Sequence, residues 1–106
     1  MQMEAMLETA QTVSELMKSL GNPKRLLILC QLAEGEKPVS ELARLTRMRE
    51  PAVSQQLALL RKDGIVSPRR VGQNVLYGLT RDDVRRLIEF LYAAYCEPAC
   101  AEDGTR

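Results

Sequence analysis

The sequence predicts a mainly helical domain that contains one small β-hairpin. Apolar residues recur at helical spacings of three and four over most of the chain. Two short helical segments meet at a tight turn near residues 46–49, and a stretch with alternating apolar residues follows them. With 106 residues, of which 45% are apolar, the chain is expected to form one compact domain.

The first two helices are predicted from an apolar stripe and from their end signals. The stripe of the first helix contains Met6, Ala10, Val13, Met17 and Leu20, and the helix is expected to end at Gly21. Asn22 suits an N-cap and Pro23 suits the first helical position, so a second helix should begin there and end at Gly35. Its run from Leu26 to Cys30 is too apolar to face water on any side, which predicts a central helix.

Two shorter helices come next, separated by the turn at 46–49. Residues 38–45 are expected to form the third helix and residues 50–64 the fourth. Pro51 is tolerated because first-turn amides have no partner within a helix, and Gly64 is a typical helix end. The fourth helix should point its apolar residues inward, namely Val53, Leu57 and Leu60.

A hairpin and a fifth helix complete the predicted order. Ile65-Val66 and residues 75–79 have strand character on either side of a turn at 71–74. Asp82 begins the last helix, whose apolar stripe runs to its end near Cys96. The stripe residues are Val84, Leu87, Ile88, Leu91, Tyr92 and Tyr95. The predicted order is four helices, of which the third and fourth form a helix-turn-helix, followed by a hairpin and a closing helix. This is the order of a winged helix-turn-helix.

The domain is expected to span residues 1–97, followed by a polar C-terminal tail at 98–106. The stripes of the first and last helices together exceed what a domain of this size can cover, so we expect them to form a homodimer interface. The N-terminus has neither a basic start nor an apolar signal core, and the apolar stretches are short. These features predict a cytoplasmic protein that is not associated with a membrane.

Positive charge is concentrated around the helix-turn-helix and the hairpin. The net charge is +1, but residues 44–70 contain seven basic and two acidic residues, a local balance of +5 that leaves −4 for the rest. Such a face can neutralise a few phosphates of double-stranded DNA. The residues expected to contact DNA are Arg49, Ser54, Gln55, Gln56, Arg61, Arg69, Arg70 and Gln73. Three of them, at positions 54–56, lie where a helix start could meet base edges in a major groove.

The same basic face has two other interpretations. It could be a surface that is simply exposed to solvent. It could also be the surface through which a winged helix binds another protein, in which case it would bind DNA no better than any other basic surface. An enzyme is not expected, because the chain has no histidine base, no glycine-rich phosphate loop and no paired carboxylates in a cleft, and no cofactor is predicted. A thiol peroxidase acting through Cys30 or Cys96 is the one catalytic alternative.

Three cysteines, Cys30, Cys96 and Cys100, lie outside the presumed DNA-reading element. In a reducing cytosol thiols serve as packing residues, metal ligands or redox sensors rather than as lasting structural disulfides. Cys30 could be a small core residue, Cys96 a thiol at a frayed helix end, and Cys100 a dispensable extra. The residues alone leave these interpretations open.

Over essentially the whole chain, the sequence resembles the ArsR/SmtB family of bacterial repressors. The segments RLLILCQLAEGE, PAVSQQLALLRKDGIV, GQNVLYGL and LYAAYC are similar to its BigR/SqrR/HlyU branch, whose members respond to persulfides and related oxidants. In that branch one cysteine lies in the second helix and its partner at the end of the last, and Cys30 and Cys96 occupy these places. The resemblance implies a homodimeric repressor that binds an inverted-repeat operator when reduced. It also implies that reactive sulfur releases the DNA by bridging the two thiols.

The sequence departs from other branches of the family in ways that bear on its ligand. The third helix, where a metal-sensing box carries cysteines, contains no thiol at residues 41–45, and a histidine-rich zinc site is impossible without histidine. A serine common at the start of the recognition helix is Arg49 here and a common histidine is Gln56, so operator preference is not carried over. The leading rival is a repressor that senses arsenite or another soft ion through Cys30, Cys96 and Cys100.

Overall fold

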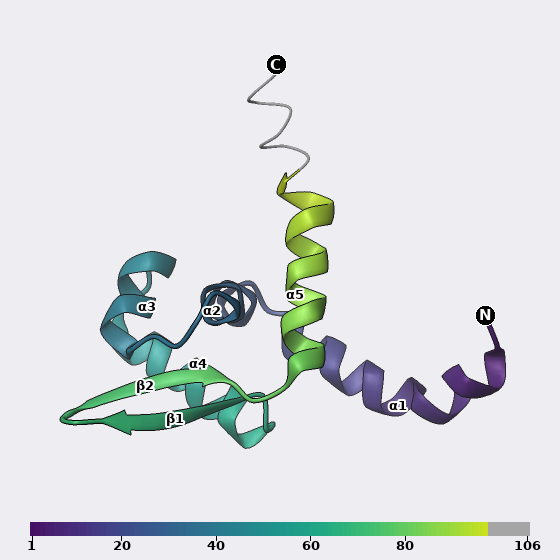
Figure 1. The fold of residues 1–106 in the computed structure, drawn as a ribbon, viewed down its shortest axis with the longest axis horizontal. Coiled ribbons are helices and arrows are strands. Elements are labelled where there is room, and N and C mark those ends of the chain that lie inside the picture. Colours follow the sequence, from purple (N-terminus) through teal and green to yellow (C-terminus); the bar gives the residue numbers. More distant parts are fainter. Residues whose placement is uncertain (98–106) are drawn as a thin grey trace, which may run out of the picture.

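The computed structural model describes residues 1–97. The expected tail at 98–106, with Cys100, lies outside the described residues. The elements are α1 (Met3–Leu20), α2 (Pro23–Ala33), α3 (Val39–Thr46), α4 (Glu50–Lys62), β1 (Val66–Val71), β2 (Asn74–Leu79) and α5 (Asp82–Tyr95) (Figure 1). This is the winged helix-turn-helix order that the sequence predicts.

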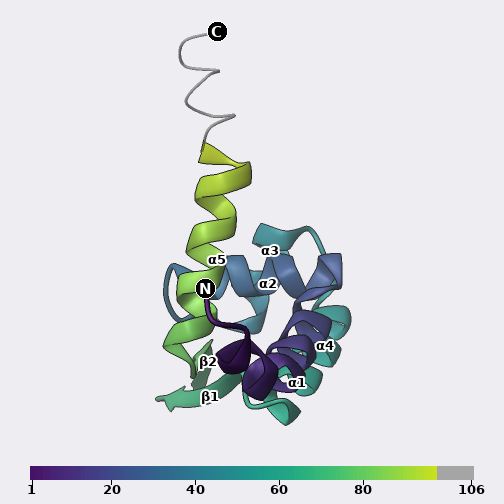
Figure 2. The ribbon, with the colours of Figure 1, turned by 90° about the vertical axis from the view of Figure 1, so that its right-hand side faces the viewer.

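Helices α2, α3 and α4 and the hairpin form the body of the molecule, and α1 and α5 extend away from it. In Figures 1 and 2, α5 rises past the body toward the C-terminus, while α1 runs out toward the N-terminus. Helix α5 packs on α2 and β2, and α1 contacts α2. The long ends of both terminal helices are therefore free of the body of their own chain.

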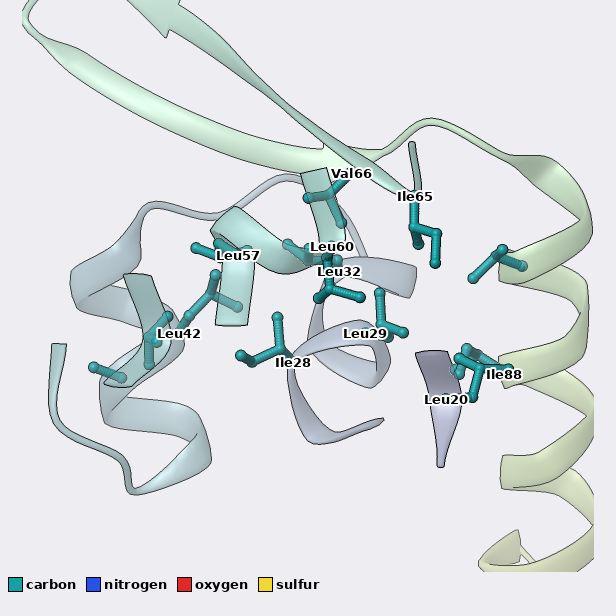
Figure 3. Packing of buried hydrophobic residues seen from close by; sticks show 13 residues of the cluster. Leu20, Ile28, Leu29, Leu32, Leu42, Leu57, Leu60, Ile65, Val66 and Ile88 are labelled. Atoms are coloured by element: carbon teal, nitrogen blue, oxygen red, sulfur yellow. The ribbon is translucent and has the colours of Figure 1, made fainter. Parts of the chain in front are cut away.

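The core is built around α2, as the sequence predicts. Ile28, Leu29 and Leu32 are completely buried at its centre (Figure 3). The other elements contribute Leu20, Leu42, Ala43, Val53, Leu57, Leu60, Ile65, Val66, Val84 and Ile88. The prediction that no side of this helix faces water is wrong for Leu27, which is 48% exposed, because side chains 100° apart on a helix cannot all meet the same neighbours.

The apolar stripe of α1 is mostly uncovered within one chain. Leu20 is buried in the last turn, whereas Met6, Val13 and Met17 are exposed. The far end of α5 is similar, since Tyr92 and Tyr95 are exposed while the residues nearer its start reach the core. Uncovered apolar faces therefore run along both terminal helices.

The predicted N-cap of α2 is present. The Asn22 side chain caps α2 as predicted, accepting hydrogen bonds from the backbone N–H of Lys24 (2.9 Å) and Arg25 (3.3 Å).

The hairpin is longer than the expected strands, because β1 continues through the basic residues to Val71, which pairs with Asn74. The predicted four-residue turn is therefore reduced to its central two residues, of which Gly72 takes a left-handed φ of 63°.

Candidate DNA-binding surface and dithiol pair

The turn between α3 and α4 is fixed by its backbone. Arg47 ends α3 in a left-handed conformation (φ 58°, ψ 40°), and the next residue, Met48, donates its N–H to the Ala43 carbonyl at 3.0 Å. Met48 also packs against the core. Arg49 is then the N-cap of α4, with an exposed side chain that makes no cap hydrogen bond. These contacts set the direction in which α4 leaves the turn.

Helix α4 separates a core face from a polar face. Its predicted inward residues are buried, whereas Ser54 and Gln55 are exposed near its start. Gln56 is only partly exposed, and its Oε1 is buried with no hydrogen-bond partner within residues 1–97. Arg61 is exposed at the far end of the helix. The structure therefore groups Arg49, Ser54 and Gln55 and separates Arg61 from them.

The wing carries the remaining predicted residues. Arg69 pairs with Leu76 and Arg70 with Val75 in the antiparallel register, and Gln73 lies in the loop between the strands. All three polar residues are exposed. Because successive residues of a strand point to opposite faces, Arg69 and Arg70 present their charges on different sides of the hairpin.

Arg69 has an acidic partner that the sequence does not reveal. Its Nε lies 2.9 Å from Glu36 Oε2, and its Nη2 lies 2.5 Å from Glu36 Oε1. The hydrogen bonds from Arg69 hold the pKa of the Glu36 carboxyl below its ordinary value, so the carboxylate is charged at neutral pH. The two residues are 33 positions apart, and no local pattern signals this pair.

A short connector between α2 and α3, residues 34–38, brings Glu36 to the wing. Lys37 and Tyr77 exchange backbone hydrogen bonds of 3.0 and 2.9 Å, which adds a bridge to the edge of β2. The Lys37 side chain turns back to α2, where Nζ donates to the Gln31 carbonyl at 2.7 Å. The connector therefore touches both the end of α2 and the wing.

The two thiols predicted to act together come from packed helices. Cys30 is partly buried in α2, and Cys96 is exposed directly after α5, its N–H donating to the Tyr92 carbonyl at 2.8 Å. Both are free thiols. Burial raises the pKa of the Cys30 thiol, and the negative charges of Cys96 and Glu34 raise it further. The two residues are 66 positions apart in the sequence, but Cys30 lies in α2 and Cys96 directly follows α5, and these two helices pack against each other.

A further contact holds the start of α5 to the end of α2. The Arg85 guanidinium donates to the Ala33 carbonyl at the C-terminal end of α2.

Within residues 1–97, no three His, Cys, Asp or Glu side chains are grouped so that they could hold a metal ion. The three-cysteine site is not tested by this, because Cys100 lies beyond that range. In the same range no helix combines the length and apolar character needed to cross a membrane.

Known proteins place the chain in a family. The profile described as "Bacterial regulatory protein, arsR family" matches residues 22–67, which include the helix-turn-helix. A biofilm growth-associated repressor from Agrobacterium fabrum is 46% identical over 94 residues, covering 89% of this chain and 80% of the relative. This chain belongs to the arsR family of bacterial regulatory proteins. The family consists of DNA-binding transcription regulators, not enzymes.

Solved structures of the arsR family agree with the fold. The transcriptional repressor BigR from Xylella fastidiosa is 40% identical and superposes with a TM-score of 0.85, covering 91% of this chain and 98% of BigR. A homodimeric winged helix-turn-helix DNA-binding domain from Mycobacterium bovis is 32% identical with a TM-score of 0.72, covering 88% of this chain and 86% of that domain. The fold and the resemblance to the arsR family that the sequence predicts are thereby confirmed.

Proposed function

We propose that this arsR-family regulator is a dithiol repressor. It binds operator DNA when both thiols are reduced and releases the DNA when reactive sulfur species bridge Cys30 and Cys96. The observation that carries the proposal is the packing of α2, which contains the free thiol of Cys30, against α5, which the free thiol of Cys96 directly follows. The same chain has an α4 and a wing whose exposed residues are polar and basic. The repressor names of two similar proteins support the direction of control. A protein that acts on DNA and on small sulfur species is expected in the cytoplasm.

The DNA-binding surface divides into base-reading and phosphate-binding parts. Ser54 and Gln55, exposed near the start of α4, are in the position from which a recognition helix reaches base edges in the major groove. Phosphate contacts would come from exposed residues at both ends of α4 and in the wing, namely Arg49, Arg61, Arg69, Arg70 and Gln73. Gln56 has a smaller role than the sequence suggested, because its Oε1 is buried.

A homodimer formed by α1 and α5 would present two such surfaces. The uncovered apolar faces of both helices need a partner, and the similar domain from Mycobacterium bovis is homodimeric. In a two-fold dimer the recognition helices meet successive major grooves roughly 34 Å apart, which selects an inverted repeat. We therefore assign an inverted-repeat operator to the dimer.

The sensing reaction needs only the two thiols and a persulfide, R–S–SH. The exposed Cys96 thiolate attacks the outer sulfur, which forms Cys96–S–SH and releases the thiol R–SH. Cys30 then attacks the Cys96 sulfur, which forms the disulfide and releases hydrogen sulfide. The thiols are oxidised and the transferred sulfur is reduced, so the electrons balance without another oxidant. A second sulfur transferred before closure would remain in the bridge as a trisulfide.

Bridging would change DNA binding because α5 has two roles. It carries Cys96 and is also part of the proposed dimer interface, whereas α2 carries Cys30 and is fixed to the connector that contacts the wing. A bridge that moves these helices by about 1 to 2 Å would alter the spacing of the two half-site readers. The coupling this requires is typically about 1 to 3 kcal/mol.

Variants in which one of the three cysteines is replaced test the proposal. Cys30→Ser and Cys96→Ser should each bind the operator as tightly as the reduced wild type and stay bound after persulfide treatment, whereas Cys100→Ser should still be released. Release of Cys30→Ser or Cys96→Ser by persulfide would contradict the dithiol mechanism. Release of the wild type by arsenite, abolished in Cys100→Ser, would instead indicate the three-thiolate metalloid sensor.

A further inference from the structure

The ion pair between Glu36 and Arg69 is the feature that the proposed function leaves unexplained. The Glu36 carboxylate accepts bidentate hydrogen bonds from the Arg69 guanidinium and so occupies N–H donors that a DNA phosphate would use. Arginine binds carboxylate and phosphate through the same pairs of N–H groups. Arg69 is thus a basic wing residue that already has an anionic partner in the absence of DNA.

Three independent contacts hold Glu36 in this place. The backbone bridge between Lys37 and Tyr77 fixes the next residue of the connector to β2. A Cβ on Gly78 would lie 3.0 Å from the Glu36 Cγ, so the Glu36 side chain fills the space left by the missing side chain. The ion pair itself is the third contact. The position of the carboxylate is therefore built into the fold.

We propose that Glu36 is an affinity-setting residue that competes with DNA phosphate for Arg69 and keeps operator binding weaker than the wing alone would allow. The inference rests on the proposed function, because it requires Arg69 to face DNA. The pair is exposed, with 59% of the Arg69 and 38% of the Glu36 side chain accessible, so phosphate can reach the guanidinium and displace the carboxylate. Exposed ion pairs are weak, which makes such an exchange possible at small cost.

The size of the effect follows from the strength of such pairs. Removal of the competing carboxylate should tighten binding by roughly two- to five-fold for each wing on DNA. Arg70 is the wing cation without a competitor, because its side chain is exposed and has no hydrogen-bond or ion-pair partner within residues 1–97. Glu36 should therefore act on one wing arginine and leave the other unaffected.

The test is a double-mutant cycle on reduced protein, with affinity for the operator and for random DNA measured by fluorescence anisotropy. Glu36→Gln keeps the side-chain shape and removes its charge, and it should raise operator affinity at least two-fold. Glu34→Gln is the matched control: it removes the same charge from the same connector, but Glu34 pairs with Lys37 instead of Arg69. It should change affinity less than Glu36→Gln does. In an Arg69→Ala background, Glu36→Gln should have no further effect.

Two results would overturn the inference. Unchanged or weaker binding by Glu36→Gln would show that the carboxylate orients Arg69 and does not compete for it, and a gain that persists in Arg69→Ala would show a general charge effect. These failures differ from failure of the proposed function, which would appear in the wild type as equal affinity for operator and random DNA.

Discussion

Arg47 carries backbone strain at a decisive point of the fold. It adopts φ 58° where the chain turns from α3 to α4, a conformation that glycine takes without cost and other L-residues take at a cost of about 1 to 2 kcal/mol. We expect Arg47→Gly to relieve this strain and to raise the free energy of unfolding by at most about 1 kcal/mol. The gain is partly offset because glycine has greater conformational freedom in the unfolded chain. Urea denaturation of the reduced protein measures this, and a clear decrease in stability would show that the Arg47 side chain stabilises the turn.

The two thiols of the proposed sensor should differ in reactivity. The raised pKa of Cys30, caused first by its burial and then by the charges of Cys96 and Glu34, leaves less thiolate at neutral pH. Iodoacetamide should therefore alkylate the exposed Cys96 before Cys30, with the Cys30 rate still rising at a pH where an ordinary thiol has levelled off. Cys96→Ser should speed alkylation of Cys30 at a fixed pH, since it removes one cause of the shift. Peptide mass spectrometry follows both sites, and faster labelling of Cys30 in the wild type would contradict this order.

Residue-scale predictions from the sequence were reliable where a local rule applied. The cap formed by Asn22 and the inward residues of α4 follow from short-range patterns, and the structure confirms them. The exposure of Leu27 and the partial burial of Gln56 depend on which neighbours each side chain meets. Those neighbours come from distant parts of the chain, so a periodic pattern could not identify them.

At the scale of elements, α4 and the wing should make separable contributions to DNA binding. Arg70→Ala should weaken binding to all DNA and reduce the slope of log affinity against log salt by about 0.9 for each DNA phosphate that is no longer neutralised. Gln55→Ala should instead lower the preference for operator over random DNA, because its proposed contact is to a base edge. Titrations at several salt concentrations measure both effects, and equal weakening on both kinds of DNA for both variants would contradict this division.

For the hairpin, the sequence predicts the element itself but not its full length or its contact with the connector. Its existence and its turn were readable from alternating apolar residues around Gly72, whereas its true length required the backbone register. The connector was not predicted as part of the wing at all, because the Lys37 and Tyr77 bridge joins segments 40 positions apart. The candidate site was therefore predicted as a set of basic, uncharged polar and thiol residues, but Glu36, the acidic partner of Arg69, was not predicted.

For the whole molecule, the uncovered face of α1 predicts a dimer that a single charge can weaken. Val13→Lys places a charge in the exposed apolar stripe and should shift the protein toward monomer. Gln11→Lys is the control, since residue 11 lies on a different side of α1, where its side chain bonds Glu15. Sedimentation over a range of concentrations compares them. Equal dimerisation of both variants would show that this stripe is not the interface.

In the proposed mechanism, one covalent event between Cys30 and Cys96 controls DNA binding. The most direct measurement is intact-protein mass spectrometry after treatment with glutathione persulfide, with operator binding followed in the same samples and Cys100→Ser run alongside. We predict a product that has two fewer hydrogens, carries any retained sulfur between Cys30 and Cys96, and no longer binds the operator. A protein that stays an unmodified dithiol and remains bound to DNA, yet releases it when arsenite is added, would contradict the claim.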